Sequence, residues 1–423
     1  MADRHSIRVE KSTGARDYSV EFQTEDKYAD KWKNVLRSAH LNKLPVSCQC
    51  AGLGPRRFAV RYMSGSDSYH LARFPDSGEE HALNCVYQSM KSNKTGLQGY
   101  SKGVVEETGD GDLRIKLTLS LRKQEAADSG EPRAERSYSP SVYAKKPAMT
   151  LLGLLHLLWT EANLNSWWPS LAGRRDMFVV HLRLIQAASR ITTNRLRLDD
   201  ALVVAAPTSG GAQQRANEVK VASAIRNSRR LLVIAPLAAH TKERAAGTSG
   251  FLAIKGFHGV PKLSLDQETW AAVCKRFPRE LIAWAHGKRI VAIVQTDKPE
   301  SASAAQALNI ALMHVSEEWV PVDSLYESTI EAKLRAENRH FNKPLRFDAE
   351  EDSVFPDFWL LDLPSNRELP MEVYGLSDKK YLERKAEKTL HYAKEYGTQG
   401  WWQWDAAKDP EGLAIDPFPV PKP

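Results

Sequence analysis

Two acidic residues lie in neighbouring apolar segments near the C-terminal end of the chain. Asp357 follows Pro356 at the start of one segment, and Glu372 lies within the next, after a short polar turn. Both segments have the composition of β-strands. A carboxylate framed by apolar strand residues needs a partner, and a cation is the simplest one. We therefore predict that Asp357 and Glu372 form a two-carboxylate metal site on a hairpin.

A second set of candidate ligands lies in the N-terminal part of the chain. Cys48 and Cys50 precede two strand-like segments, and His81 and Cys85 follow them. Three thiolates and one imidazole make a full tetrahedral ligand set for structural Zn²⁺. His81 and Cys85 are four residues apart, which suits one face of a helical turn. We predict a zinc site here; the alternative is a group of buried thiols with a surface histidine.

The elements that must position the two acids are predicted for residues 319–423. Ser324 can cap a helix over residues 325–338, with Glu327 three residues later as in a capping box. This helix precedes a strand over 343–347, the two acid-bearing strands, a helix over 378–396 and a strand over 401–404. The predicted order is α-β-β-β-α-β.

This order, together with Pro356-Asp357 and Glu372, resembles the PD-(D/E)XK nuclease superfamily. The resemblance implies a restriction-endonuclease-like core that hydrolyses phosphodiesters with Mg²⁺ or Mn²⁺ on carboxylate oxygens. Carried over by motif, Asp357 and Glu372 would be the metal ligands. Glu327 would be the helix acid of the family pattern, with Glu331, one turn later, as its alternative.

The lysine of that family motif is missing, because Tyr374 occupies its position. A cation from the following helix could replace it. Four residues recur there at the spacing of one helical face: Tyr381, Lys385, Lys388 and Tyr392. Lys385 is the first candidate for the missing charge and Lys388 the second. The alternative is that this is a solvated basic face with no part in a site.

The composition is that of a soluble globular protein, with 423 residues, 42% hydrophobic and 26% charged. A net charge of +7 favours a polyanionic partner only slightly, since 52 acids are mixed with 59 bases. The sequence has no phosphate loop, dinucleotide glycine pattern or catalytic serine elbow. It also lacks a signal-peptide pattern and any apolar run of about 20 residues. We expect a cytoplasmic protein without a membrane span.

We expect a multidomain, mixed α+β architecture. The composition changes to Ser, Pro, Glu and Lys after the β-rich N-terminal module that the predicted zinc site would stabilise. This change marks an exposed linker between that module and the following regions of the chain. Two apolar helices over 150–163 and 176–190 either pack a core or form a helix-turn-helix. The predicted parts are an N-terminal module (1–121), the linker (122–147), a helical region (148–205), a mixed α/β region (206–318) and the nuclease-like domain (319–423).

A closer resemblance spans most of the chain. It rests on the Cys-x-Cys and His-x-x-x-Cys patterns and on three C-terminal motifs. The chain resembles DUF1173, a bacterial family of unknown function with some members called LtrC-like. Such genes are typical of plasmids and integrative conjugative elements, so the resemblance implies a mobile-element context. The motifs are Phe355-Pro356-Asp357-Phe358, Met371-Glu372-Val373-Tyr374-Gly375 and Trp402-Gln403-Trp404-Asp405.

The leading hypothesis is a Mg²⁺-dependent nuclease that acts on DNA. The alternative is a non-catalytic nucleic-acid-binding or assembly protein that keeps the nuclease fold without its lysine. A transcriptional regulator using the middle helices is a third possibility. The sequence leaves DNA versus RNA and the protein partners open. The positions of Lys385 and Lys388 relative to the acid pair distinguish the first two hypotheses.

Overall fold

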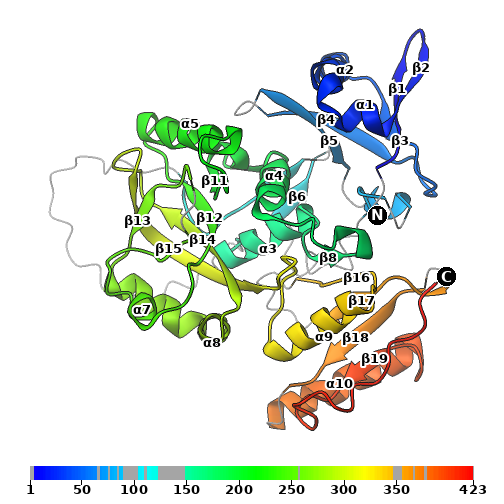
Figure 1. Ribbon diagram of the computed structural model, residues 1–423, viewed down its shortest axis with the longest axis vertical. Helices are drawn as coiled ribbons and strands as arrows, with labels where there is room; N and C mark the ends of the chain where they lie inside the picture. Colours follow the sequence, from blue (N-terminus) through cyan, green and yellow to red (C-terminus); the bar gives the residue numbers. More distant parts are fainter. Residues whose placement is uncertain are drawn as a thin grey trace.

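The structure is a computed structural model, which describes residues 4–63, 67–74, 77–82, 85–88, 103–108, 112–121, 148–255, 258–345, 355–364, 367–375 and 379–422. The predicted linker over 122–147 lies outside the described residues, and so does the acidic loop before the Asp357 segment. Within the described part of the chain the protein is a mixed α+β structure built on four sheets (Figure 1).

The N-terminal sheet has five strands, and each strand pairs antiparallel with its neighbours. Helix α2 packs on it because Trp32, Val35 and Ala39 recur at helical spacing and join the N-terminal core. The strands, in sheet order, are β2 (Gly14–Tyr18), β1 (Ile7–Lys11), β3 (Val46–Cys48), β4 (Arg57–Met63) and β5 (Ser68–Arg73), and the helices are α1 (Val20–Thr24) and α2 (Ala29–Leu41).

The helical region carries the two predicted apolar helices, α3 (Leu151–Glu161) and α4 (Met177–Ala188). Thr150 and Asp176 cap them by accepting a backbone N–H, as such residues do. Both helices contribute to the largest hydrophobic core, which supports the core-packing interpretation. A small sheet lies beside them, in the order β10 (Leu196–Arg197), β9 (Ile191–Thr193), β7 (Leu113–Ile115) and β6 (Val105–Glu107).

The central sheet is mixed, and β12, β14 and most of β15 are buried, as their continuous apolar runs predict. Two helices follow each other directly in this region, because Pro278 begins a new helix after Phe277. The strands, in sheet order, are β11 (Leu202–Val204), β12 (Leu232–Pro236), β14 (Arg289–Thr296), β15 (Ala304–Val315) and β13 (Lys262–Ser264), and the helices are α5 (Ala212–Arg226), α6 (Lys242–Ala246), α7 (Gln267–Arg276) and α8 (Pro278–Ala285).

The C-terminal sheet follows the chain order α-β-β-β-α-β through α9, β16, β17, β18, α10 and β19. The strand predicted over 343–347 was misplaced: β16 is Phe341–Asn342, because Pro344 has no N–H to extend the ladder. The strands, in sheet order, are β19 (Trp402–Trp404), β18 (Leu369–Val373), β17 (Phe358–Leu360), β16 and β8 (Ser166–Trp167), and the helices are α9 (Leu325–Ala336) and α10 (Lys379–Tyr396).

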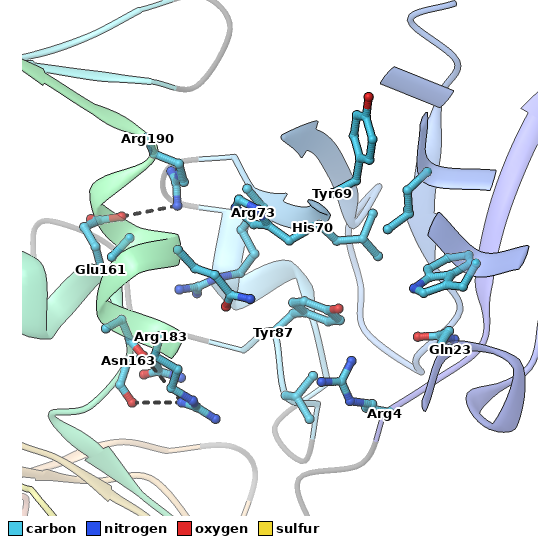
Figure 2. A pocket seen from close by; sticks show the side chains of 18 residues that line it. Arg4, Gln23, Tyr69, His70, Arg73, Tyr87, Glu161, Asn163, Arg183 and Arg190 are labelled. Carbon is cyan, nitrogen blue, oxygen red and sulfur yellow. Dashed lines mark hydrogen bonds and ion pairs between the residues drawn. The ribbon is translucent and has the colours of Figure 1, made fainter. Parts of the chain in front are cut away.

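A cavity of about 310 Å³ lies between the N-terminal sheet and the ends of α3 and α4 (Figure 2). Its walls come from β5 and α2 on one side and from the helical region on the other. Among the described helices, none combines the length and apolar character needed to cross a bilayer.

Candidate functional site

The hairpin of β17 and β18 places Asp357 opposite Glu372. The printed strand pairing begins at Phe358 and Met371, and each acid is the residue next to that pair. The Asp357 N–H donates to the Met371 carbonyl at 2.9 Å, and its Oδ2 accepts the Val373 N–H at 2.8 Å. The charge of Asp357 acts on Glu372 and raises its pKa. The predicted carboxylate pair is therefore brought together.

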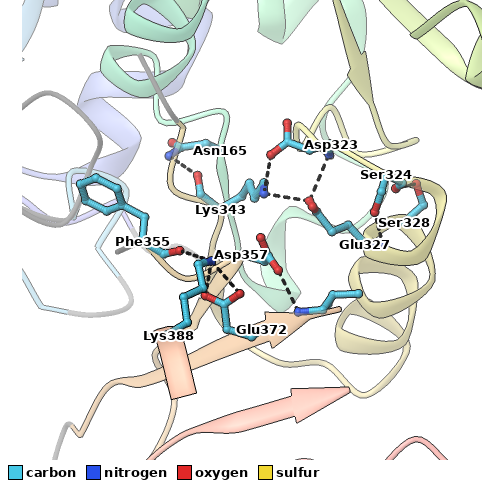
Figure 3. Close-up of polar contacts among 11 residues, drawn as sticks. Asn165, Asp323, Ser324, Glu327, Ser328, Lys343, Phe355, Asp357, Glu372 and Lys388 are labelled. Carbon is cyan, nitrogen blue, oxygen red and sulfur yellow. Dashed lines mark hydrogen bonds and ion pairs between the residues drawn. The ribbon is translucent and has the colours of Figure 1, made fainter. Parts of the chain in front are cut away.

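Helix α10 covers this face of the hairpin. Lys388 Nζ lies 2.8 Å from both carboxylate oxygens of Glu372 and donates to the Phe355 carbonyl at 3.2 Å (Figure 3). One turn later, the Tyr392 hydroxyl donates to Glu372 Oε1 at 2.7 Å. Glu372 is 1% exposed, so this acid is bound by a lysine and a phenol inside the protein.

The other two members of the predicted face of α10 also contact the β18 end of the hairpin. The Tyr381 hydroxyl accepts the Gly375 N–H at 3.1 Å. Lys385, the first candidate cation, lies 4.4 Å from the centre of the Tyr374 ring and pairs with Asp405 at 2.7 Å. The cation on Glu372 is thus the second candidate, Lys388. A solvated basic face does not describe these contacts.

Helix α9 lies on the opposite face of the sheet, where Ile330 and Leu334 share a core with Met371 and Val373. Only its first turn reaches the polar site. Ser324 Oγ accepts the Glu327 N–H at 3.0 Å, and Glu327 Oε2 accepts the Asp323 N–H at 3.0 Å. The predicted cap is present, and it orients the Glu327 carboxylate.

Glu327 is held by a lysine that sequence reasoning did not assign to the site. Lys343 Nζ lies 2.8 Å from Glu327 and 2.9 Å from Asp323, and its side chain is 2% exposed (Figure 3). Its backbone N–H donates to the Asn165 carbonyl at 2.8 Å, which continues the pairing of β16 with β8. The only sequence signal for this role of Lys343 is its place beside a strand and before Pro344. A lysine is rarely buried unless it is paired.

Glu331, the alternative helix acid, has other partners. Arg335 Nε donates to it at 2.8 Å across one helical turn. Burial raises the pKa of Glu331, and Arg335 opposes the shift. Of the two helix acids, Glu327 is the one joined to the lysine network beside Asp357.

The network carries an excess of negative charge. Four carboxylates, those of Asp323, Glu327, Asp357 and Glu372, accompany the two ammonium groups of Lys343 and Lys388.

The pKa of Glu372 is raised to about 7, chiefly by burial and also by the charge of Asp357. The charge of Lys388 acts in the opposite direction. Burial likewise raises the pKa of Glu327, against the opposing charge of Lys343. Burial alone would lower the pKa of Lys343, but the carboxylates outweigh it and raise the pKa above its ordinary value. Protons or a cation would relieve this excess charge.

Tyr374, which replaces the lysine of the resembled motif, cannot supply a positive charge. It is 2% exposed. Burial raises the pKa of its phenol, and the charges of Glu372 and Asp357 raise it further. The phenol is therefore neutral, and the positive charge at this acid pair comes from α10.

The N-terminal cysteines and histidine form a second buried cluster. Cys48, Cys50, His81 and Cys85 place one ligand atom each within 4.8 Å of one another. The Cys48 and Cys85 sulfurs are 3.8 Å apart, and His81 Nδ1 lies 3.5 and 3.6 Å from the Cys85 and Cys50 sulfurs. Tetrahedral zinc, with bonds of about 2.3 Å to sulfur and about 2.0 Å to nitrogen, gives about 3.8 Å between two sulfurs and about 3.5 Å between sulfur and nitrogen. The cluster can hold a metal ion such as zinc.

Two loops that contact each other closely position these ligands. Cys48 ends β3, and Glu80 Oε2 accepts the Arg56 N–H at 2.9 Å between the loops. A Cβ on Gly52 would lie 1.9 Å from the Glu80 carbonyl oxygen, so only glycine allows this approach. The Ala82 N–H donates to the Cys50 sulfur at 3.4 Å.

These features define a mixed α+β protein with a Cys₃His cluster in one sheet region and a buried carboxylate–lysine network on another sheet. The chain belongs to the family DUF1173, described as a protein of unknown function, which it matches over residues 18–407. Comparison with curated proteins and with solved structures gave no match.

Proposed function

We propose that this protein is a metal-dependent nuclease that hydrolyses phosphodiester bonds in DNA, with its active site at the β17–β18 hairpin. The observation that carries the proposal is the contact of Lys388 with Glu372, whose pKa the charge of Asp357 raises. The resembled nuclease motif has a lysine at the position of Tyr374. In this chain Lys388 would supply that positive charge from α10. The α-β-β-β-α-β order of the surrounding elements is consistent with that resemblance.

The donor set fits a hard divalent cation. Asp357 and Glu372 offer carboxylate oxygens, the ligands preferred by Mg²⁺ and Mn²⁺, and the network has the excess negative charge that such an ion neutralises. A bound Mg²⁺ would lower the pKa of a water and stabilise charge on the phosphate. Lys388 would orient that water and stabilise the developing negative charge. Glu327, held by Lys343, would act as the helix acid beside the pair.

The remaining features extend the proposal to the whole chain. The Cys₃His cluster would hold a structural Zn²⁺ that fixes the N-terminal loops. The N-terminal module and middle region would then orient the DNA. The LtrC-like resemblance supports a role on plasmids or integrative conjugative elements in the bacterial cytoplasm.

The test is a cleavage assay on plasmid and single-stranded DNA with Mg²⁺ or Mn²⁺. Wild type should cleave, and Glu372→Ala should lose cleavage by about 100-fold or more. The matched control is Glu387→Ala, which removes an exposed acid of α10 next to Lys388 and should cleave as wild type does. No cleavage by wild type, or equal cleavage by Glu372→Ala, would refute the nuclease proposal.

A non-catalytic role is the second candidate, favoured by one observation. Glu372 already has Lys388 and Tyr392 as partners, so it is satisfied without a metal. A nucleic-acid-binding or assembly protein with a degenerate nuclease site would look the same. In that case the protein would shift DNA in a gel without cutting it. Addition of Mg²⁺ would change the DNA affinity of the wild type no more than that of Glu372→Ala.

A further inference from the structure

The cavity between the N-terminal sheet and the helical region brings four arginines together from distant parts of the chain. Arg4 precedes β1, Arg73 ends β5, Arg183 lies in α4 and Arg190 follows it (Figure 2). The only acid among the described residues that line the cavity is Glu161, 3.3 Å from Arg190. The described lining therefore carries a clear excess of positive charge.

The arginines are held in place by the fold around them. Arg183 donates to the carbonyls of Ala162 and Asn163 at 3.4 and 3.5 Å, and Arg190 is buried. The pKa of Arg73 is lowered to about 10, chiefly by burial and also by the charges of Arg190 and Arg183, against the opposing charge of Glu161. Guanidinium groups that repel one another in a fixed cavity are stabilised by an anion.

The remaining walls indicate what kind of anion fits. The cavity volume of about 310 Å³ lies at the lower end of the range of small-molecule sites. It is therefore larger than one inorganic phosphate needs. Aromatic rings of Trp32, Tyr69 and Tyr87 line the side nearer the N-terminal sheet. Planar guanidinium groups bind phosphate oxygens in a bidentate manner, and aromatic rings stack on bases.

We propose that this cavity binds a free nucleotide, with its phosphates on Arg73, Arg183 and Arg190 and its base against the aromatic wall. The site is distinct from the acid pair of the C-terminal sheet, and it does not depend on the nuclease proposal. A ligand here contacts both the N-terminal module and the helical region, so its binding would stabilise their arrangement.

Isothermal titration calorimetry of the full chain in magnesium-free buffer tests the site with phosphate, pyrophosphate and ATP. ATP and pyrophosphate should bind, and phosphate should bind more weakly. Arg73→Gln should weaken ATP binding by about 10-fold to 100-fold, the effect of losing a charge-assisted hydrogen bond. Arg57→Gln, an exposed arginine on the neighbouring strand β4, is the matched control and should leave binding unchanged.

Two further variants separate loss of ligand binding from a folding defect and from an effect at the proposed nuclease site. Arg4→Gln alters an exposed arginine at the cavity, so it should weaken binding even if Arg73→Gln fails to fold. Glu372→Ala should bind ATP as wild type does, which separates this site from the proposed nuclease site. Absence of ATP and pyrophosphate binding by wild type, or binding unchanged in both arginine variants, overturns the proposal. Arginine-dependent binding of a 5′-phosphorylated oligonucleotide that ATP cannot displace also overturns it, because the occupant is then nucleic acid.

Discussion

Lys388 is the residue on which the proposed chemistry depends. It contacts both oxygens of Glu372 within the protein, whereas Lys385, one turn earlier, contacts Asp405 and the Tyr374 ring. The two lysines lie on nearly the same side of α10, yet only Lys388 contacts the acid pair. Variants of these two lysines therefore distinguish a role in the site from a general contribution of positive charge.

We predict that Lys388→Met lowers the rate of DNA cleavage by about 100-fold or more, because it removes the positioned cation. Lys385→Met should cost less than about 10-fold, since Lys385 is paired with Asp405 instead. Single-turnover cleavage of a plasmid measures both rates. A similar loss in the two variants would mean that the helix supplies only a general positive field.

A second prediction at the residue scale concerns pH. The pKa of Glu372 is raised to about 7 in the folded protein, from 4.5 as its ordinary value. Between these values the folded state binds more protons than the unfolded state, so stability falls as pH rises through this window. Each unit of pKa difference corresponds to about 1.4 kcal/mol. Stabilisation by Mg²⁺ should grow over the same window, because a cation favours the carboxylate.

The measurement is the free energy of urea unfolding, with and without Mg²⁺, on either side of the window. Glu372→Gln, which cannot ionise, should show a smaller decrease of stability with pH and a smaller response to Mg²⁺. An unchanged slope in this variant would show that other groups, Glu327 among them, determine the pH dependence.

At the scale of elements, the N-terminal loops depend on their shared cluster. The loop after Cys48 and the short 3-10 helix η3 (Ser77–Glu80) before His81 approach each other closely at Gly52. Short segments of this kind are held by a metal when their own core is small. The cluster therefore connects local chain geometry to the stability of the N-terminal sheet.

We predict about one zinc per chain in wild type and less than about half in Cys85→Ala, with earlier proteolysis of the N-terminal region. A strong chelator should have the same effect on wild type. Cys274→Ala is the matched control, because Cys274 lies in α7 outside the cluster and should leave zinc content unchanged. Elemental analysis and limited proteolysis give the readouts, and equal zinc in all three proteins would refute the site.

Several elements were predictable from local patterns, and others were not. The Ser324 cap, the helix periodicity of α10 and the two strands of the hairpin follow from neighbouring residues, and all appear in the structure. Glu372 lies within its strand, whereas Asp357 directly precedes β17. The short strand β16 was misplaced by two residues, because a strand's bounds depend on its partner.

At the scale of the whole molecule, the C-terminal sheet is completed from outside residues 319–423. Strand β8 pairs with β16, and Asn342 Nδ2 donates to Ser166 Oγ at 2.7 Å. Arg175, 5% exposed, donates to the carbonyls of Leu164 and Glu318 at 3.1 and 3.2 Å. The helical region is thus built into the sheet that carries the acid pair.

We predict that a fragment of residues 319–423 folds poorly, because it lacks β8 and leaves the edge of β16 unpaired. A fragment of residues 148–423 should be folded and monomeric. Circular dichroism and size-exclusion chromatography compare the two. Cooperative unfolding of the shorter fragment, at the same temperature as the longer one, would show that the sheet is complete without β8.

The sequence by itself determined the types of residue available and the local elements that carry them. Two acids on paired strands, a capped helix acid and a Cys₃His ligand set follow from composition and short-range spacing. Only the tertiary structure decided that Lys388 rather than Lys385 contacts Glu372, and that Lys343 joins Glu327. The physical reason is that residues three apart on a helix differ by about 60° around its axis. Which of them meets a strand depends on how the helix packs, and that is set by contacts between distant parts of the chain.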